Sequence, residues 1–145
     1  MKDKIFLDTN IFVYSIDSSP REKAKSLMAR ELVRDHIKNE SGVISIQVLQ
    51  EFYQVATQKI GILLPSDQAL EYLNYISILE TILPEFHMIV SAIRLHQKYT
   101  LSFWDALILQ AASTAGCSKV LSEDLQNGFQ VNELIVENPF INSNL

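Results

Sequence analysis

The stretch KIFLDTN, residues 4–10, decides the fold, because a short apolar run stops in it at Asp8. Ile5, Phe6 and Leu7 are too few for a helix and are typical of a β-strand that is buried on both faces. Asp8 stands where burial is expected, and a buried carboxylate without a partner is costly or becomes protonated. The stretch therefore predicts a buried strand, and the aspartate at its end needs a physical explanation.

Short apolar runs and helical patterns alternate along the rest of the chain. Helix starts are indicated by a serine or proline before apolar residues at helical spacing, at Ser19-Pro20, Ser45, Pro65-Ser66 and Ser102, with a further helix through Ile89–Leu95. Further strands are expected at Val43–Ile44, Thr81–Leu83, Lys119–Leu121 and, as a fifth, Leu134–Val136. This alternation predicts an α/β fold with a mostly parallel sheet of four or five strands and helices on both faces.

The length and the cysteine content narrow the class of protein. A chain of 145 residues has the size of one domain, so we expect residues 1–145 to form a single domain. Cys117 is the only cysteine, which excludes an intramolecular disulfide and a thiolate zinc site and favours a cytoplasmic location. No stretch approaches about 18 uninterrupted apolar residues, so we expect neither membrane insertion nor export.

The formal net charge of −5 excludes a global basic field of the kind that drives non-specific binding to nucleic acids. A polyanionic partner would need a local basic patch. The clearest candidate is a group of cations on one segment: Arg21, Lys23, Lys25, Arg30, Arg34 and Lys38. Acids lie among them and partly cancel the charge, which favours a solvated helix face over a binding patch.

Acidic and amide side chains follow two of the predicted strands. Asp8 and Asn10 come after the first strand, and Asp124 comes after the strand at Lys119–Leu121. Ligands of such sheets bind outside the carboxyl ends of the strands, where the strand order reverses. The alternatives are that Asp8 and Asn10 hydrogen-bond turn amides, and that Asp124 lies in an exposed acidic turn where Glu123 competes for the inward position.

Two helices supply further acids. Asp105 lies in the first turn of an apolar helix after Ser102, and Glu51 shares a helical stripe with Val48 and Val55. Asp105 could instead complete a capping box with Ser102 and suit the helix dipole, and Glu51 could be an ordinary solvated glutamate. The sequence alone does not decide between these alternatives.

The predicted fold explains how Asp8, Glu51, Asp105 and Asp124 could meet at one edge of the sheet. At about 5 Å and an effective dielectric constant near 20, each pair of ionised carboxylates repels by roughly 3 kcal/mol, so a cation or protons must be present. Oxygen ligands suit Mg²⁺ or Mn²⁺ better than zinc or copper. Because no phosphate loop or serine triad is evident, metal-assisted hydrolysis is the chemistry that the residues favour.

Four segments in order carry a resemblance to the PIN domain family, and in particular to the toxin-type ribonucleases of bacterial and archaeal toxin-antitoxin pairs. They are FLDTNIFVY, SIQVLQEFYQV, LSFWDALILQAA and VLSEDLQNG, and together they span nearly the whole chain. The resemblance implies a three-layer α/β/α fold, a cluster of acids that holds magnesium or manganese, and endonucleolytic cleavage of RNA. It also implies a homodimer and an antitoxin protein as partners.

Carried over position by position, the resemblance makes Asp8, Glu51, Asp105 and Asp124 the catalytic and metal-binding acids. Asn10 and Ser122 match positions that support the acids by orienting ligands or substrate. Many relatives have a further acid shortly after the Asp124 position, where this chain has Asn127, so a complete second metal site is in doubt.

Two other functions stay open at this point. A catalytically degenerate PIN-like domain would bind RNA or a protein without cutting, which fits the acidic charge and Asn127. A phosphatase with an aspartyl nucleophile after its first strand fits less well, because Asn10 replaces the second aspartate and no matching lysine is evident.

Overall fold

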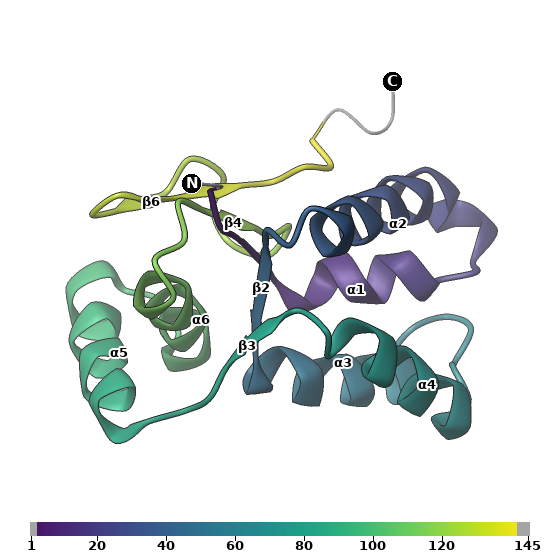
Figure 1. The fold of residues 1–145 in the computed structure, drawn as a ribbon, viewed down its shortest axis with the longest axis horizontal. Helices are drawn as coiled ribbons and strands as arrows, with labels where there is room; N and C mark the ends of the chain where they lie inside the picture. The colour runs from purple at the N-terminus through teal and green to yellow at the C-terminus, as the bar shows by residue number, and fades with distance from the viewer. Residues whose placement is uncertain (1–2, 142–145) are drawn as a thin grey trace.

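The run that ends at Asp8 forms strand β1 (Ile5–Leu7), which lies inside a sheet with the strand order β3-β2-β1-β4-β6-β5 (Figure 1). The structure is a computed structural model that describes residues 3–141. Within that range the sheet has six strands, of which β1 and four others run parallel: β2 (Gly42–Ser45), β3 (Glu80–Ile82), β4 (Lys119–Leu121) and β6 (Leu134–Glu137). The mostly parallel sheet that the sequence predicts is confirmed.

The sheet has one strand more than the four or five predicted. Strand β5 (Gln130–Val131) pairs antiparallel with β6 through a turn that contains Asn132, whose φ of 54° lies in the left-handed region. Asparagine tolerates this conformation better than most residues, which suits it to a tight hairpin turn. A strand of two residues is too short to produce a recognisable alternation in the sequence.

Helix α1 (Thr9–Ile16) follows β1 directly and is absent from the sequence prediction, which has a turn there. Ile11 and Val13 are β-branched and Phe12 is aromatic, so intrinsic propensity does not favour a helix. Tertiary burial overrides that propensity, because Ile11 and Phe12 are fully buried in the core. Asp8 is the residue before the helix, and its side chain accepts a hydrogen bond from the Thr9 amide.

The other helices cover both faces of the sheet. In Figure 1, α5 and α6 lie on one side of the strands and α1 to α4 lie on the other, which gives the three layers expected for an α/β/α fold. Their bounds are α2 (Lys23–Lys38), preceded by the short 3₁₀ helix η1 (Pro20–Glu22), α3 (Ile46–Gln58), α4 (Ser66–Ile76), α5 (Phe86–Tyr99) and α6 (Phe103–Thr114). In the part of the chain described, no helix is long and apolar enough to cross a membrane.

The predicted helix starts are at the right places, but only one serine caps through its side chain. Ser102 accepts a hydrogen bond from the Asp105 amide at 3.0 Å, which is half of the expected capping box. Ser19 makes no side-chain cap, and the Pro20 signal produces a 3₁₀ turn before α2. Ser45 precedes α3 but its hydroxyl is buried without a hydrogen-bond partner.

The strand order places a topological switch point between β1 and β4. The chain moves from β1 to β2 and β3 on one side and then returns to β4 on the other side of β1. Leu7 pairs with Leu121 in register, so the next residues, Asp8 and Ser122, come side by side at the carboxyl ends of the two strands. This is where an open α/β sheet binds its ligands.

Close packing between β2 and its neighbours yields a stability prediction. A Cβ atom at Gly42 would lie 2.8 Å from Leu79 Cδ2 and 3.1 Å from His36 Cβ, and Leu79 is buried. We expect Gly42→Ala to lower the free energy of unfolding by about 1–3 kcal/mol, because the core must shift to accept the methyl group. Urea denaturation followed by circular dichroism measures the change.

Gly61→Ala is the matched control, since its Cβ would meet only Ser19 Oγ, at 3.4 Å. It should leave the free energy of unfolding unchanged or raise it slightly. Equal stability of the Gly42 and Gly61 variants would contradict the packing that we describe.

Candidate functional site

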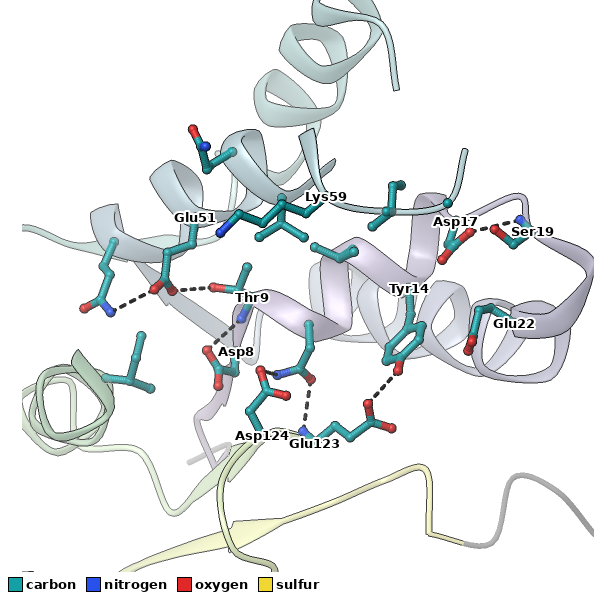
Figure 2. Close-up of a pocket in the computed structure, with 18 of the residues that line it drawn as sticks. Asp8, Thr9, Tyr14, Asp17, Ser19, Glu22, Glu51, Lys59, Glu123 and Asp124 are labelled. Atoms are coloured by element: carbon teal, nitrogen blue, oxygen red, sulfur yellow. Dashed lines mark hydrogen bonds between the residues drawn. The ribbon is translucent and has the colours of Figure 1, made fainter. Parts of the chain in front are cut away.

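A pocket with a volume of about 490 Å³ opens at the switch point, and all four acids singled out in the sequence line it. Asp8 comes from the junction of β1 and α1, Glu51 from α3, Asp105 from the first turn of α6 and Asp124 from the loop after β4. We call this the acidic pocket; Figure 2 shows part of its lining. Three more acids line it: Asp17, Glu22 and Glu123.

Asp8 is the buried member of the set, with only 6% of its surface exposed. Its Oδ1 accepts a hydrogen bond from the Thr9 amide at 2.7 Å, and its Oδ2 accepts one from the Ser122 hydroxyl at 2.7 Å. The first bond begins α1 and the second ties β1 to β4. The alternative that Asp8 bonds a turn amide is therefore correct as far as it goes, but it accounts for one oxygen only.

Burial raises the pKa of Asp8 from 3.8 to about 6. Desolvation is the main cause, and the negative charges of Asp124 and Glu51 raise the pKa further, while the bonds from Ser122 and Thr9 lower it.

Asn10 and Ser122 organise the loop after β4. The fully buried Ser122 hydroxyl accepts hydrogen bonds from the Asp124 amide at 3.1 Å and from Asn10 Nδ2 at 3.3 Å. Asn10 Nδ2 also donates to Asp124 Oδ2 at 3.3 Å, and its Oδ1 accepts from the Glu123 amide at 3.0 Å. Both residues thus fix the position of Asp124 relative to Asp8. Their polar side-chain atoms are occupied by these hydrogen bonds.

Glu123 and Asp124, the two acids of that loop, point in different directions, and Asp124 is the one that points inward. Glu123 accepts a hydrogen bond from Tyr14 and an ion pair from Lys25 at 2.6 Å, so its charge is neutralised beside α1 and α2. The bond to Glu123 raises the pKa of Lys25, and burial with the Glu123 contact raises that of Tyr14 to about 12. Asp124 keeps its charge directed at the acidic pocket (Figure 2).

The pKa of the Asp124 carboxyl is raised by partial desolvation and then by the negative charges of Glu123 and Asp105, while the Asn10 hydrogen bond lowers it. Asp105 lines the acidic pocket while its amide is capped by Ser102. The capping and pocket readings of Asp105 are therefore compatible, because one uses the backbone and the other the side chain.

Glu51 is not a solvated surface glutamate. Its Oε1 accepts a hydrogen bond from Thr9 Oγ1 at 2.9 Å, and its Oε2 accepts one from Gln47 Nε2 at 3.4 Å. The same Gln47 nitrogen donates to the Trp104 carbonyl at 3.2 Å, which links α3 to the start of α6 beside Asp105. Two neutral donors therefore hold Glu51 in the acidic pocket without cancelling its charge.

The donor set fits a hard divalent cation, although the acids are not yet gathered around one point. Among residues 3–141, no three His, Cys, Asp or Glu side chains form a ready-made metal cluster. None of Asp8, Glu51, Asp105 or Asp124 forms an ion pair with a cation of the described chain. Carboxylate oxygens are the ligands that Mg²⁺ and Mn²⁺ prefer, so the chemistry of the four acids fits such an ion.

The contacts by which four residues support the site were not predicted from the sequence: Thr9, Tyr14, Lys25 and Gln47. Thr9 and Tyr14 lie on α1, which was not predicted, so their direction was unknown. Gln47 could have been found, because it precedes Glu51 by one helical turn and glutamine at that spacing can hydrogen-bond a carboxylate. Lys25 was noted only as part of a basic patch.

Asn127, the position at which the resemblance led us to look for a further acid, does not line the acidic pocket within the described chain. Its Oδ1 accepts a hydrogen bond from the Asn138 amide at 2.8 Å and so joins the loop after β4 to the segment after β6. The absence of an acid here therefore leaves the four pocket acids unaltered.

The family model described as the PIN domain matches residues 5–130, which is most of the chain. No curated protein sequence matches the chain.

Several solved structures share the fold. VapBC2 from Rickettsia felis, bound to a DNA fragment from its promoter, is 23% identical, with a TM-score of 0.65 over 92% of this chain and 97% of that one. A toxin-antitoxin complex from Klebsiella pneumoniae is 18% identical, with a TM-score of 0.64 over 91% and 96%. The sarcin-ricin loop cleaving toxin VapC20 of Mycobacterium tuberculosis is 16% identical, with a TM-score of 0.63 over 83% and 90%.

The raised pKa of Asp8 predicts a pH-dependent stability in metal-free solution. A carboxyl group that holds its proton more tightly in the folded state gives stability that is complete below about pH 3.8 and is lost as the pH rises through about 6. We expect the free energy of unfolding of the parent to fall by about 2–3 kcal/mol relative to Asp8→Asn between about pH 4 and pH 7.

Urea unfolding with EDTA at several pH values measures this difference, and the asparagine variant cancels the contributions of all other titrating groups. A gap between the two proteins that does not change with pH would contradict the burial of an ionisable Asp8.

Proposed function

The chain belongs to the PIN domain family, and from that premise we propose that it is an endoribonuclease that depends on Mg²⁺ or Mn²⁺ and acts as the toxin of a toxin-antitoxin pair. The observation that carries the proposal is the meeting of Asp8, Glu51, Asp105 and Asp124, from four separate elements, in one pocket at the switch point of the sheet. Neutral donors hold Asp8, Glu51 and Asp124, and none of the four acids pairs with a cation of the described chain, so their negative charge is available to a metal ion.

We assign Asp8, Asp105, Asp124 and Glu51 as the residues that would hold the metal. The bound ion would supply charge neutralisation at a phosphodiester group and a lowered pKa of water, which are the functions that metal-assisted hydrolysis needs. Its positive charge would also remove the cost of burying Asp8, because it lowers the pKa of the carboxyl groups around it.

The protein's own residues prepare this site. Asp8 is fixed by the Thr9 amide and the Ser122 hydroxyl, so it is a rigid ligand, while the Asn10 contacts set the approach of Asp124. The Thr9 and Gln47 bonds orient Glu51 from the opposite wall. Such hydrogen bonds to ligands are typical of functional metal sites.

The partners follow from the relatives by analogy. The solved structures include a toxin-antitoxin complex and a toxin that cleaves the sarcin-ricin loop. We propose RNA as the substrate, an antitoxin protein as the inhibitor, a homodimer as the assembly and the cytoplasm as the location.

A catalytically degenerate PIN-like domain that binds RNA or a protein is the second candidate, because Asn127 replaces an acid that many relatives have. The engagement of Asn127 with Asn138 outside the acidic pocket weakens this reading. Calorimetric titration with MnCl₂ separates the two, since a degenerate site would take up no ion at millimolar concentration.

The phosphatase reading loses its support. In such an enzyme the residue two positions after the nucleophile would have to exchange a proton, whereas Asn10 is occupied with Ser122, Glu123 and Asp124.

Charge removal at Asp8 tests the proposed activity. We expect Asp8→Asn to lower the rate of cleavage of single-stranded RNA in Mn²⁺ by at least about a hundredfold, because a removed metal ligand typically costs that much or more. Asp67→Asn is the matched control, since it removes one negative charge from the first turn of α4, outside the acidic pocket. It should keep the rate within about threefold of the parent. Cleavage by Asp8→Asn at the parental rate would refute the assignment.

A further inference from the structure

The acidic pocket is longer than a metal site requires. Besides the four acids it is lined by residues along α1 as far as Asp17 and Ser19, at the other end of that helix (Figure 2). Helix α1 has 8 residues and is therefore about 12 Å long at 1.5 Å per residue. That length corresponds to roughly three stacked nucleotides at 3.4 Å each.

A polyanion that enters this pocket meets a surface of mostly negative charge. Seven acids line the pocket, against two cations, Arg21 and Lys59. A metal ion at the four acids would compensate the charge of one phosphate, but charges of neighbouring phosphates lie beyond its immediate contacts. The adjoining part of the strand therefore needs a cation of the protein.

Lys59 has the properties that this role needs, whereas Arg21 does not. The Arg21 side chain is 90% exposed and pairs with Glu22 at 3.4 Å. Lys59 follows the end of α3, and within the described chain its ammonium group has neither an ion pair nor a hydrogen bond. Figure 2 shows its side chain directed back along α3 in the direction of Glu51, and Lys59 lines the same pocket as the four acids.

We propose that Lys59 binds a backbone phosphate of the RNA next to the one that is cleaved, and so positions the strand in the acidic pocket. This inference rests on the proposed function. Lys59 acts as a positioning residue, because it holds a phosphate that does not react. The ammonium group is a point charge with three donors, which suits a phosphate whatever the adjoining base, so the contact adds affinity without sequence preference.

The test compares Lys59→Gln and Lys59→Arg with Lys38→Gln, which removes the same charge from the last turn of α2, outside the pocket. Binding of a fluorescent single-stranded RNA is measured by anisotropy in Ca²⁺ at several salt concentrations, and a gel confirms that the RNA stays intact. Steady-state cleavage in Mn²⁺ gives kcat and KM separately.

We expect Lys59→Gln to weaken binding about three- to tenfold and to make the slope of log K against log salt shallower by about 0.7, the value for one contact with a single strand. KM should rise with little change in kcat, Lys59→Arg should restore most of the affinity, and Lys38→Gln should match the parent.

Equal affinity and equal salt slope for Lys59→Gln and the parent would overturn the inference. So would a lowered melting temperature of Lys59→Gln with an unchanged slope, because Lys59 would then only offset repulsion among the acids. A parent that binds no RNA would overturn it as well. Binding without cleavage in either Mg²⁺ or Mn²⁺ would refute the nuclease activity alone, and the effect of Lys59 on binding would still decide the inference.

Discussion

The buried carboxylate of Asp8, held between the Thr9 amide and the Ser122 hydroxyl, is the constraint on which the rest of the site depends. Its two hydrogen bonds begin α1, join the carboxyl ends of β1 and β4, and fix the floor of the acidic pocket. Burial would favour the neutral form of such a group, and its pKa of about 6 reflects that cost. A nearby cation would therefore stabilise the ionised form of the Asp8 carboxyl group.

The acids around Asp8 differ in whether a cation of the protein neutralises them. Glu123 is neutralised by Lys25, whereas Glu51 and Asp124 are held by uncharged donors from Thr9, Gln47 and Asn10. A protein that needed these acids only for stability would gain by pairing each of them with a lysine or arginine. Their arrangement leaves a net negative pocket, which is the electrostatic requirement of a site for a hard divalent ion.

The sequence predicts the sheet and the four acids because both can be recognised from the order of apolar and acidic residues along the chain. Apolar runs locate β1, β2 and β4, and the rule that ligands lie beyond the carboxyl ends of parallel strands connects Asp8 with Asp124. Helix α1 could not be predicted, because Ile11, Phe12 and Val13 have an intrinsic preference for β-strands. The helix is stabilised by the burial of these side chains, which the sequence pattern does not show. The contacts of Thr9 and Tyr14 depend on the direction of that helix. Strand β6 was predicted, whereas β5, with two residues, was too short to leave a pattern.

The most direct test of the account is a crystal grown with MnCl₂ and measured for anomalous scattering. We expect a manganese peak in the acidic pocket within ligand distance of Asp8 and of at least one of Asp105 and Asp124. An acidic pocket without anomalous density at millimolar manganese, or a peak bound only by other residues, would contradict the claim that these acids form a metal site.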